Sequence, residues 1–112
     1  MGEEAKIAVS VDFGVYIKSI SDISDAISGS AGTAGLILRE ADLAPEFFDL
    51  RTGLAGELFQ KFINVRKRVA IVIPDPAIHG ERFSELAYEH STHNLVRTTR
   101  SEDEAKAWLA AG

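Results

Sequence analysis

The 112-residue sequence contains no cysteine, which excludes disulfides, thiolate metal ligands and cysteine nucleophiles. It also has no apolar run that approaches the ~20 residues of a membrane-spanning helix, so we expect no membrane partner. The first residues, MGEEAKIAVSVD, lack the basic-then-apolar pattern of a signal peptide. We therefore expect a cytoplasmic protein.

Positive charge is scarce as well. Twelve Lys and Arg residues stand against seventeen Asp and Glu residues, which gives a formal net charge of −5. This balance argues against a nucleic-acid partner, because such partners require a basic surface. The basic cluster Arg66–Arg68 lies where a predicted helix meets a predicted strand, and the dipole at a helix C-terminus stabilises cations there.

The apolar pattern alternates between strand and helix periods, which is typical of one α/β domain over residues 1–112. Lys6–Val11 and Val15–Ile20 are β-branched runs separated by Asp12-Phe13-Gly14, and this arrangement predicts a first hairpin. Val69–Ile73 (VAIVI) has no polar alternation, which predicts a central strand covered on both faces. The other predicted strands are Leu36–Arg39 and Leu95–Thr98.

Helical periodicity fills the segments between these strands. Leu54, Leu58 and Phe62 recur every four residues and form one apolar face. The predicted helices are, in chain order, a short one from Ser21, then Thr52–Asn64, Glu81–Thr92 and one that opens on the capping box Ser101–Glu104. The order ββαβαβαβα predicts a mixed, mostly parallel sheet with helices packed on it.

Thr52 stands at a predicted helix N-terminus, where backbone N–H groups have no partner within the helix. A short hydroxyl side chain at this place can cap the helix, hold an anion or accept a phosphate, and the sequence leaves these roles open. Gly53 and Gly56 follow directly. They either let a partner or ligand approach the backbone closely or let the helix pack closely on the sheet.

The order of elements, with a glycine-containing helix start after a strand, resembles the STAS domain, the fold of bacterial anti-sigma-factor antagonists. Thr52-Gly53-Leu54-Ala55 is similar to the Ser-Gly-Leu-Gly part of that family's Asp-Ser-Ser-Gly-Leu-Gly motif, and Val69–Ile73 is similar to the strand that follows. Arg51 stands where the family has a serine, and Asp49 lies one position further from the acceptor. The segment FFDLRTGLAGE also resembles a small bacterial family known as a domain of unknown function.

The STAS resemblance implies a non-catalytic regulatory module that binds a partner protein through Glu46–Thr52 and the first turns of the following helix. It also implies phosphorylation at Thr52, a kinase-like regulatory partner and no cofactor, and it leaves a homodimer open. The residues expected to form the partner or ligand surface are Phe48, Asp49, Arg51, Thr52, Gly53 and Gly56.

Two further functions remain as alternatives. One is a small-ligand domain of the same fold, which binds an anion or a nucleotide at the N-terminus of the Thr52 helix. The other is a small hydrolase that uses Asp49, Asp75 and His79, because a parallel sheet brings such loops to one edge. We expect no catalytic residues, because nothing in the sequence fixes the geometry of these three side chains.

Glu89, His90 and His93 have a spacing that resembles a metal site. His90 falls on the apolar face of its predicted helix, which favours a packed imidazole, and no third ligand has a persuasive spacing, so we expect no metal. The glycines of Gly29–Gly35 follow a helix and precede a strand, whereas a phosphate loop follows a strand and precedes a helix. We interpret this segment as a hinge-like connection.

Overall fold

The computed structural model describes residues 6–9 and 14–111. Within these residues the chain forms a sheet of four strands, and every neighbouring pair is parallel. The strands lie in chain order as β1 (Ile7–Val9), β2 (Gly35–Arg39), β3 (Val69–Val72) and β4 (Val96–Thr99). The predicted α/β class and the alternation of elements after the first strand are confirmed.

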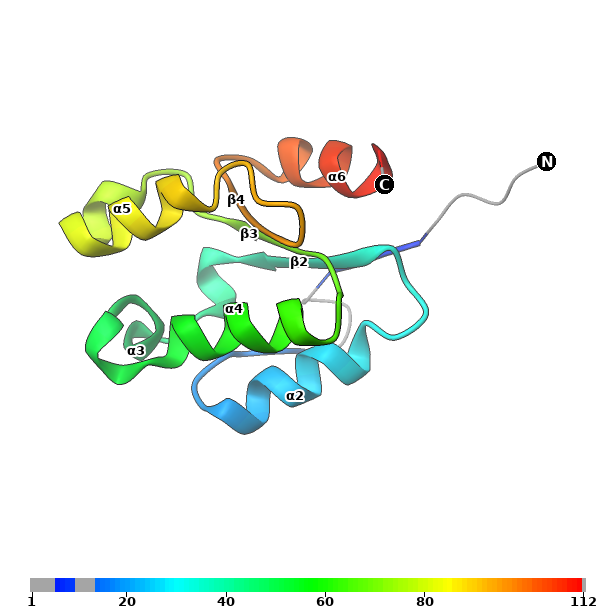
Figure 1. Cartoon of the computed structure of the whole chain (residues 1–112), viewed down its shortest axis with the longest axis horizontal. Helices are drawn as coiled ribbons and strands as arrows, with labels where there is room; N and C mark the ends of the chain where they lie inside the picture. The colour runs from blue at the N-terminus through cyan, green and yellow to red at the C-terminus, as the bar shows by residue number, and fades with distance from the viewer. Residues whose placement is uncertain (1–5, 10–13, 112) are drawn as a thin grey trace.

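Helices follow each strand and cover both faces of the sheet. In Figure 1, α2 and α4 lie on one side of the sheet and α6 lies on the other, while α3 and α5 lie at the same end of the molecule. No helix within the described residues is long and apolar enough to cross a membrane. The α-helices are α2 (Ile20–Gly29), α3 (Pro45–Phe48), α4 (Leu54–Asn64), α5 (Glu81–Glu89) and α6 (Glu102–Ala111), and the 3₁₀ turns are η1 (Glu40–Asp42), η2 (Leu50–Thr52) and η3 (Pro76–His79).

The predicted second strand, Val15–Ile20, is wrong, and the sheet is therefore all-parallel over the described residues rather than mixed. Within this run, Ile17 forms an isolated parallel bridge with Leu43, and Ile20 already belongs to α2. The backbone N–H of Ser19 donates to Oδ2 of Asp22, and this capping contact starts the helix early. Two residues of the predicted turn, Asp12 and Phe13, lie outside the described residues.

The core has two layers because the side chains of each strand alternate between the two faces of the sheet. Leu38 and Ile71 pack on the side of α2 and α4, whereas Ile37 and Ala70 pack on the side of α6. All four are fully buried, so β3 is covered on both faces as the sequence predicts. The α4 side also takes the ring of Phe62 and side chains from α5, and it forms the larger cluster.

Helix α6 is attached to the sheet at both of its ends. At its start, Nε of Arg39 donates to Oε1 of Glu102 over 2.6 Å. At its end, the guanidinium groups of Arg68 and Arg97 lie 4.3 Å and 4.7 Å from the centroid of the Trp108 ring. Arg68 also donates to the carbonyl oxygen of Trp108 over 3.1 Å, so it satisfies a carbonyl in the last turn of the helix.

Close packing requires a glycine at position 35. A Cβ at this position would lie 2.5 Å from Cδ2 of Leu109 and 2.9 Å from the carbonyl oxygen of Arg68, and the backbone atom cannot move aside cheaply. A Cβ at Gly56 would meet no atom within 4 Å.

We expect Gly35→Ala to lower the free energy of unfolding by about 1–3 kcal/mol, as overpacking does in cores. The matched change Gly56→Ala should raise it by about 0.5–1 kcal/mol, because alanine is the better helix former. Urea denaturation followed by the fluorescence of Trp108, the one tryptophan, measures both. A Gly35→Ala protein as stable as wild type would contradict the close contact with α6.

The contact of α6 with Arg39 predicts an acid dependence of stability. The hydrogen bond from Arg39 lowers the pKa of Glu102 below its ordinary value of 4.5, and Lys106 lowers it further. A pKa lowered by folding contributes stability above the ordinary value, and this contribution is lost as the pH falls through the folded-state pKa. Glu102→Gln should therefore lose less unfolding free energy than wild type as the pH falls from roughly 5 to 3.

The control for this experiment is Asp103→Asn, which removes a neighbouring carboxylate of α6 that is exposed. Unfolding free energies at each pH are measured by urea denaturation. The same pH profile for wild type and Glu102→Gln would show that the Arg39 contact contributes nothing to stability.

Candidate functional site

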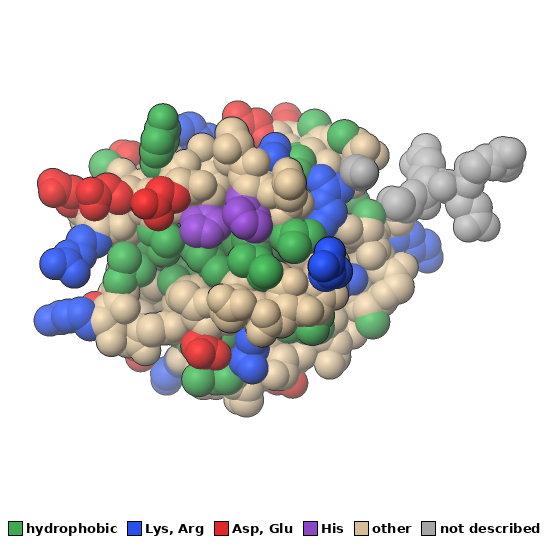
Figure 2. Space-filling model, in the orientation of Figure 1, with side chains coloured by type: hydrophobic (Ala, Val, Ile, Leu, Met, Phe, Trp, Pro, Cys, Tyr) green, Lys and Arg blue, Asp and Glu red, His purple; other side chains and the backbone are tan. Residues whose placement is uncertain are grey.

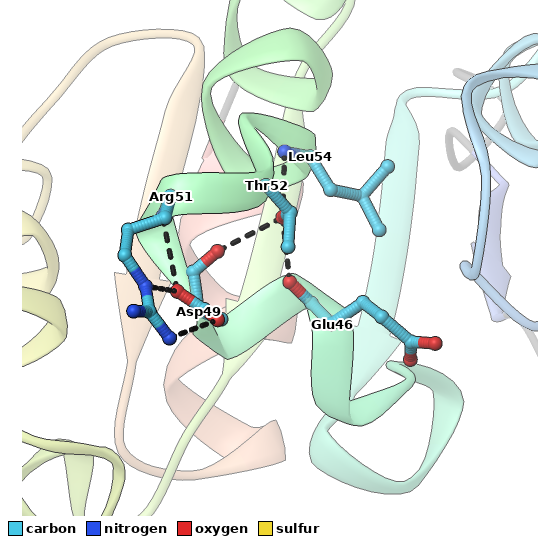
Figure 3. Close-up of polar contacts among 5 residues, drawn as sticks. All are labelled: Glu46, Asp49, Arg51, Thr52 and Leu54. Carbon is cyan, nitrogen blue, oxygen red and sulfur yellow. Dashed lines mark hydrogen bonds and ion pairs between the residues drawn. The ribbon is translucent and has the colours of Figure 1, made fainter.

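Thr52 connects three consecutive elements through its hydroxyl group. Its Oγ1 lies 2.8 Å from the carbonyl oxygen of Glu46 in α3 and 2.9 Å from that of Asp49, and it accepts the N–H of Leu54 over 3.2 Å (Figure 3). A hydroxyl has one hydrogen, so it donates to one of these two carbonyls at a time. The side chain therefore holds α3, η2 and the start of α4 together.

Helix α4 begins at Leu54, two residues later than the sequence predicts, and its N-cap is Gly53. Gly53 has φ of +77°, a left-handed conformation that favours glycine. Thr52 caps the helix from one position further back, through the N–H of Leu54. The prediction of Thr52 as the N-cap residue is therefore wrong by one position, although its hydroxyl does accept an N–H of the first turn, and Gly53 provides the turn between them.

Asp49 and Arg51 form a bidentate pair beside this turn. Nε of Arg51 lies 3.0 Å from Oδ1 of Asp49, and Nη2 lies 3.0 Å from Oδ2 (Figure 3). The side-chain hydrogen bonds from Arg51 lower the pKa of Asp49, and those to Asp49 raise the pKa of Arg51. The Arg51 side chain is 88% exposed. Because the guanidinium is bound to Asp49, it contacts the carboxylate rather than the hydroxyl of Thr52.

The first turn of α4 presents an open surface. A Cβ at Gly53 or Gly56 would meet no atom within 4 Å, so these two glycines are not required for packing of the helix on the sheet. That alternative is wrong for both of them, and Gly35 has this role instead. Beside them lies a hollow of about 230 Å³, lined by Lys18, Ser19, Ile20, Glu46, Thr52, Gly53, Leu54 and Glu57.

Phe48 lies at the edge of the sheet where β2 and β3 end. Its neighbour Phe47 is fully buried, whereas Phe48 is partly buried and stacks on His79 with ring centroids 3.7 Å apart and planes 8° apart. Nε2 of His79 is bound to Oε2 of Glu40. Sequence reasoning missed Glu40, although it directly follows β2 and lies at the edge that is reached by the loop after β3.

The three candidate hydrolase residues are each engaged separately. Asp49 binds Arg51, Asp75 accepts the N–H of Ala77 over 3.2 Å, and His79 binds Glu40. The structure therefore pairs the imidazole of His79 with a carboxylate, but the carboxylate belongs to neither Asp49 nor Asp75.

A groove of about 710 Å³ separates α3 and η2 from η3 and α5. Figure 2 shows acidic and basic side chains beside hydrophobic ones at the left end of the molecule, where Figure 1 places α3 and α5. Asp49, Arg51 and His79 all line this groove. The full lining is Pro45, Phe48, Asp49, Leu50, Arg51, His79, Gly80, Glu81, Arg82 and Phe83.

His90 and His93 lie side by side with ring centroids 5.3 Å apart. His90 packs against Phe59 and its Nδ1 bonds to the carbonyl oxygen of Leu86, while Nδ1 of His93 accepts the N–H of Leu95 over 3.0 Å. In the part of the chain that the structure describes, no group of three or more acidic or histidine side chains is placed to hold a metal ion.

Comparison with known protein families gives one finding. A family model described as a domain of unknown function, DUF4180, matches residues 3–109, which is nearly the whole chain. No curated protein and no solved structure matches the sequence. The resemblance to a family of unknown function is therefore confirmed.

The hydrogen bonds of Thr52 predict a specific mutational pattern. Thr52→Val keeps the shape of the side chain but removes the donor and the acceptor, so we expect a loss of about 1 kcal/mol in unfolding free energy. Thr52→Ser keeps the hydroxyl and should remain within a few tenths of a kcal/mol of wild type. Urea denaturation of the three proteins measures the difference. Equal stability of Thr52→Val and wild type would show that the turn is held by other contacts.

Proposed function

Because the chain belongs to the DUF4180 family, a family whose function is unknown, we propose that it is a non-catalytic regulatory module of STAS type that binds a partner protein. The binding surface is formed by the last residue of α3, the residue before η2, η2 itself, and the N-cap and first turn of α4, and we call it the η2–α4 surface. Its residues are Phe48, Asp49, Arg51, Thr52, Gly53 and Gly56.

The observation that carries this proposal is the open backbone at the start of α4. Gly56 is exposed, and its N–H group has no acceptor one turn earlier within the helix. Neither Gly53 nor Gly56 has a neighbour within 4 Å of its Cβ position. A carbonyl or carboxylate oxygen of a partner can therefore accept a hydrogen bond from the N–H of Gly56.

The surface is also pre-organised, which favours binding. The carboxylate of Asp49 accepts the N–H of Arg51 at the start of η2, and the hydroxyl of Thr52 bonds to α3 and α4. A loop that is already ordered loses less conformational entropy when it binds. The similarity of Thr52–Ala55 to the STAS motif supports the same placement of the surface.

Phosphorylation of Thr52 provides the switch in this proposal. A phosphate would replace the hydroxyl hydrogen that Oγ1 now donates to the carbonyl of Glu46 or Asp49. It would also place negative charge beside these two carbonyl oxygens, which repel it. The connection of α3 to α4 would then open, and the shape of the η2–α4 surface would change. The partner that transfers the phosphate is a kinase-like regulatory protein.

The test compares partner affinity for two tryptophan variants. Gly56→Trp fills the open surface, and Ala107→Trp places the same side chain at an exposed position of α6 on the other side of the sheet. We expect both to melt close to wild type, and we expect Gly56→Trp alone to weaken binding of a kinase-like partner, by roughly tenfold or more for a blocked contact. Isothermal titration with the purified partner measures the affinity.

The same partner tests the switch. Mass spectrometry after incubation with ATP should find phosphate at residue 52 in wild type and in Thr52→Ser, and none there in Thr52→Val. Unchanged partner affinity for Gly56→Trp would overturn the binding surface. Phosphate found elsewhere in the chain, with residue 52 unmodified, would overturn the switch while leaving the binding surface intact.

A further inference from the structure

The segments that follow β2 and β3 carry a pair of side chains, Glu40 and His79, that do not belong to the η2–α4 surface. Glu40 follows β2, His79 follows β3, and Oε2 of Glu40 is bound to Nε2 of His79. The imidazole stacks on Phe48 and meets the edge of Phe83, whose centroid lies 5.5 Å away. The His79 side chain is 16% exposed. Its contacts with Glu40, Phe48 and Phe83 therefore hold the ring in one orientation.

This arrangement leaves one nitrogen of His79 without a hydrogen-bond partner among the described residues. Nε2 is occupied by Glu40, and no residue within 6–9 and 14–111 forms a hydrogen bond with Nδ1. Within the described part of the chain, every buried side-chain nitrogen or oxygen of a residue that is not exposed has a hydrogen-bond partner. Because Nδ1 of His79 has no such partner, this atom must be accessible to solvent. With a proton on each nitrogen, the ring donates to Glu40 on one side and to an anion on the other.

The groove that His79 lines supplies both charge and apolar contact. Its volume of about 710 Å³ lies in the range of small-molecule sites, ~300–1,000 Å³. Arg82 lines the groove, is exposed, and has no hydrogen bond or ion pair to the described residues. The other charges along the groove are Glu81 and the Asp49–Arg51 pair, in which each partner neutralises the other.

We propose that this groove is a second binding site, which holds a small organic anion with an apolar body. Arg82 and Nδ1 of His79 bind the anionic head, a carboxylate or a phosphate, and Glu40 keeps the imidazole in place. Pro45, Leu50 and the free part of Phe48 contact the body. The groove shares Phe48, Asp49 and Arg51 with the η2–α4 surface, but the two residues that bind the anionic head, His79 and Arg82, lie outside that surface. Binding of the anion does not depend on a protein partner.

The chemistry of the ligand is tested by titration of the full chain with four probes, followed by ¹H–¹⁵N NMR. Benzoate and phenyl phosphate carry a head and a body, inorganic phosphate carries a head alone, and benzyl alcohol carries a body alone. We expect saturable shifts at the amides of Gly80–Phe83 with one or both of the first two probes. The last two should bind roughly tenfold more weakly, since each lacks one class of contact.

The residue assignment is tested by Arg82→Ala with Arg100→Ala as its matched control. Both arginines are exposed, and Arg100 lies outside the groove lining. Arg82→Ala should weaken the bound anion roughly tenfold while Arg100→Ala leaves the affinity unchanged, and both should melt like wild type. Glu40→Ala, which removes the side chain that holds the imidazole of His79 in place, should weaken binding as well.

Three outcomes would overturn the proposal. The first is the absence of saturable shifts at Gly80–Phe83 with both benzoate and phenyl phosphate. The second is binding of benzyl alcohol as tight as that of benzoate, and the third is equal affinity of Arg82→Ala and Arg100→Ala. Gly56→Trp should leave anion binding unchanged, which separates this site from the η2–α4 surface.

Discussion

The burial of β3 on both faces is the constraint on which the rest of the structure depends. Val69, Ala70 and Ile71 are fully buried, and a strand without a solvent face needs a helix layer on each side of the sheet. Helix α4 provides one layer and α6 the other, and parallel pairing with β2 then follows from the crossover through α4. The same parallel pairing brings the residues after β2 and β3 to one edge. Both proposed surfaces lie in the segments that leave this edge.

The sequence predicts those parts of the fold whose signal is local. The continuous apolar run at Val69–Ile73 and the four-residue recurrence of Leu54, Leu58 and Phe62 describe burial within one element, and the structure confirms both. The run Val15–Ile20 has a local strand signal as well, but its outcome depends on remote contacts. Ile17 pairs with Leu43 in a loop segment, and the cap between Ser19 and Asp22 takes the end of the run into a helix. Propensity favours a strand there, and tertiary contacts override it.

In the candidate site as well, the sequence predicts some features that depend on neighbouring residues but not those that depend on remote contacts. The sequence indicates Thr52 at a helix start followed by Gly53, and the positive φ of Gly53 gives the glycine a physical reason that the sequence does not supply. It does not reveal that Arg51 turns to Asp49, because this contact depends on the tight geometry of η2. It also cannot tell which glycine packs closely, since Leu109 reaches Gly35 from a helix at the other end of the chain. The pairing of Glu40 with His79 spans 39 positions and depends on neighbouring strands, so no local pattern reveals it.

The two proposed surfaces share one short segment, and this has a consequence for regulation. The hydroxyl of Thr52 bonds to the carbonyl oxygen of Glu46 in α3, and Phe48 of the same helix stacks on His79 in the groove. Asp49 belongs to both, because its carbonyl accepts from Thr52 and its side chain lines the groove. A phosphate at Thr52 that displaces α3 must therefore also move one wall of the groove. By linkage, an anion that holds this wall in place must oppose the displacement by the same free energy. The segment Pro45–Thr52 is thus the element through which occupation of the groove and modification of Thr52 would act on each other.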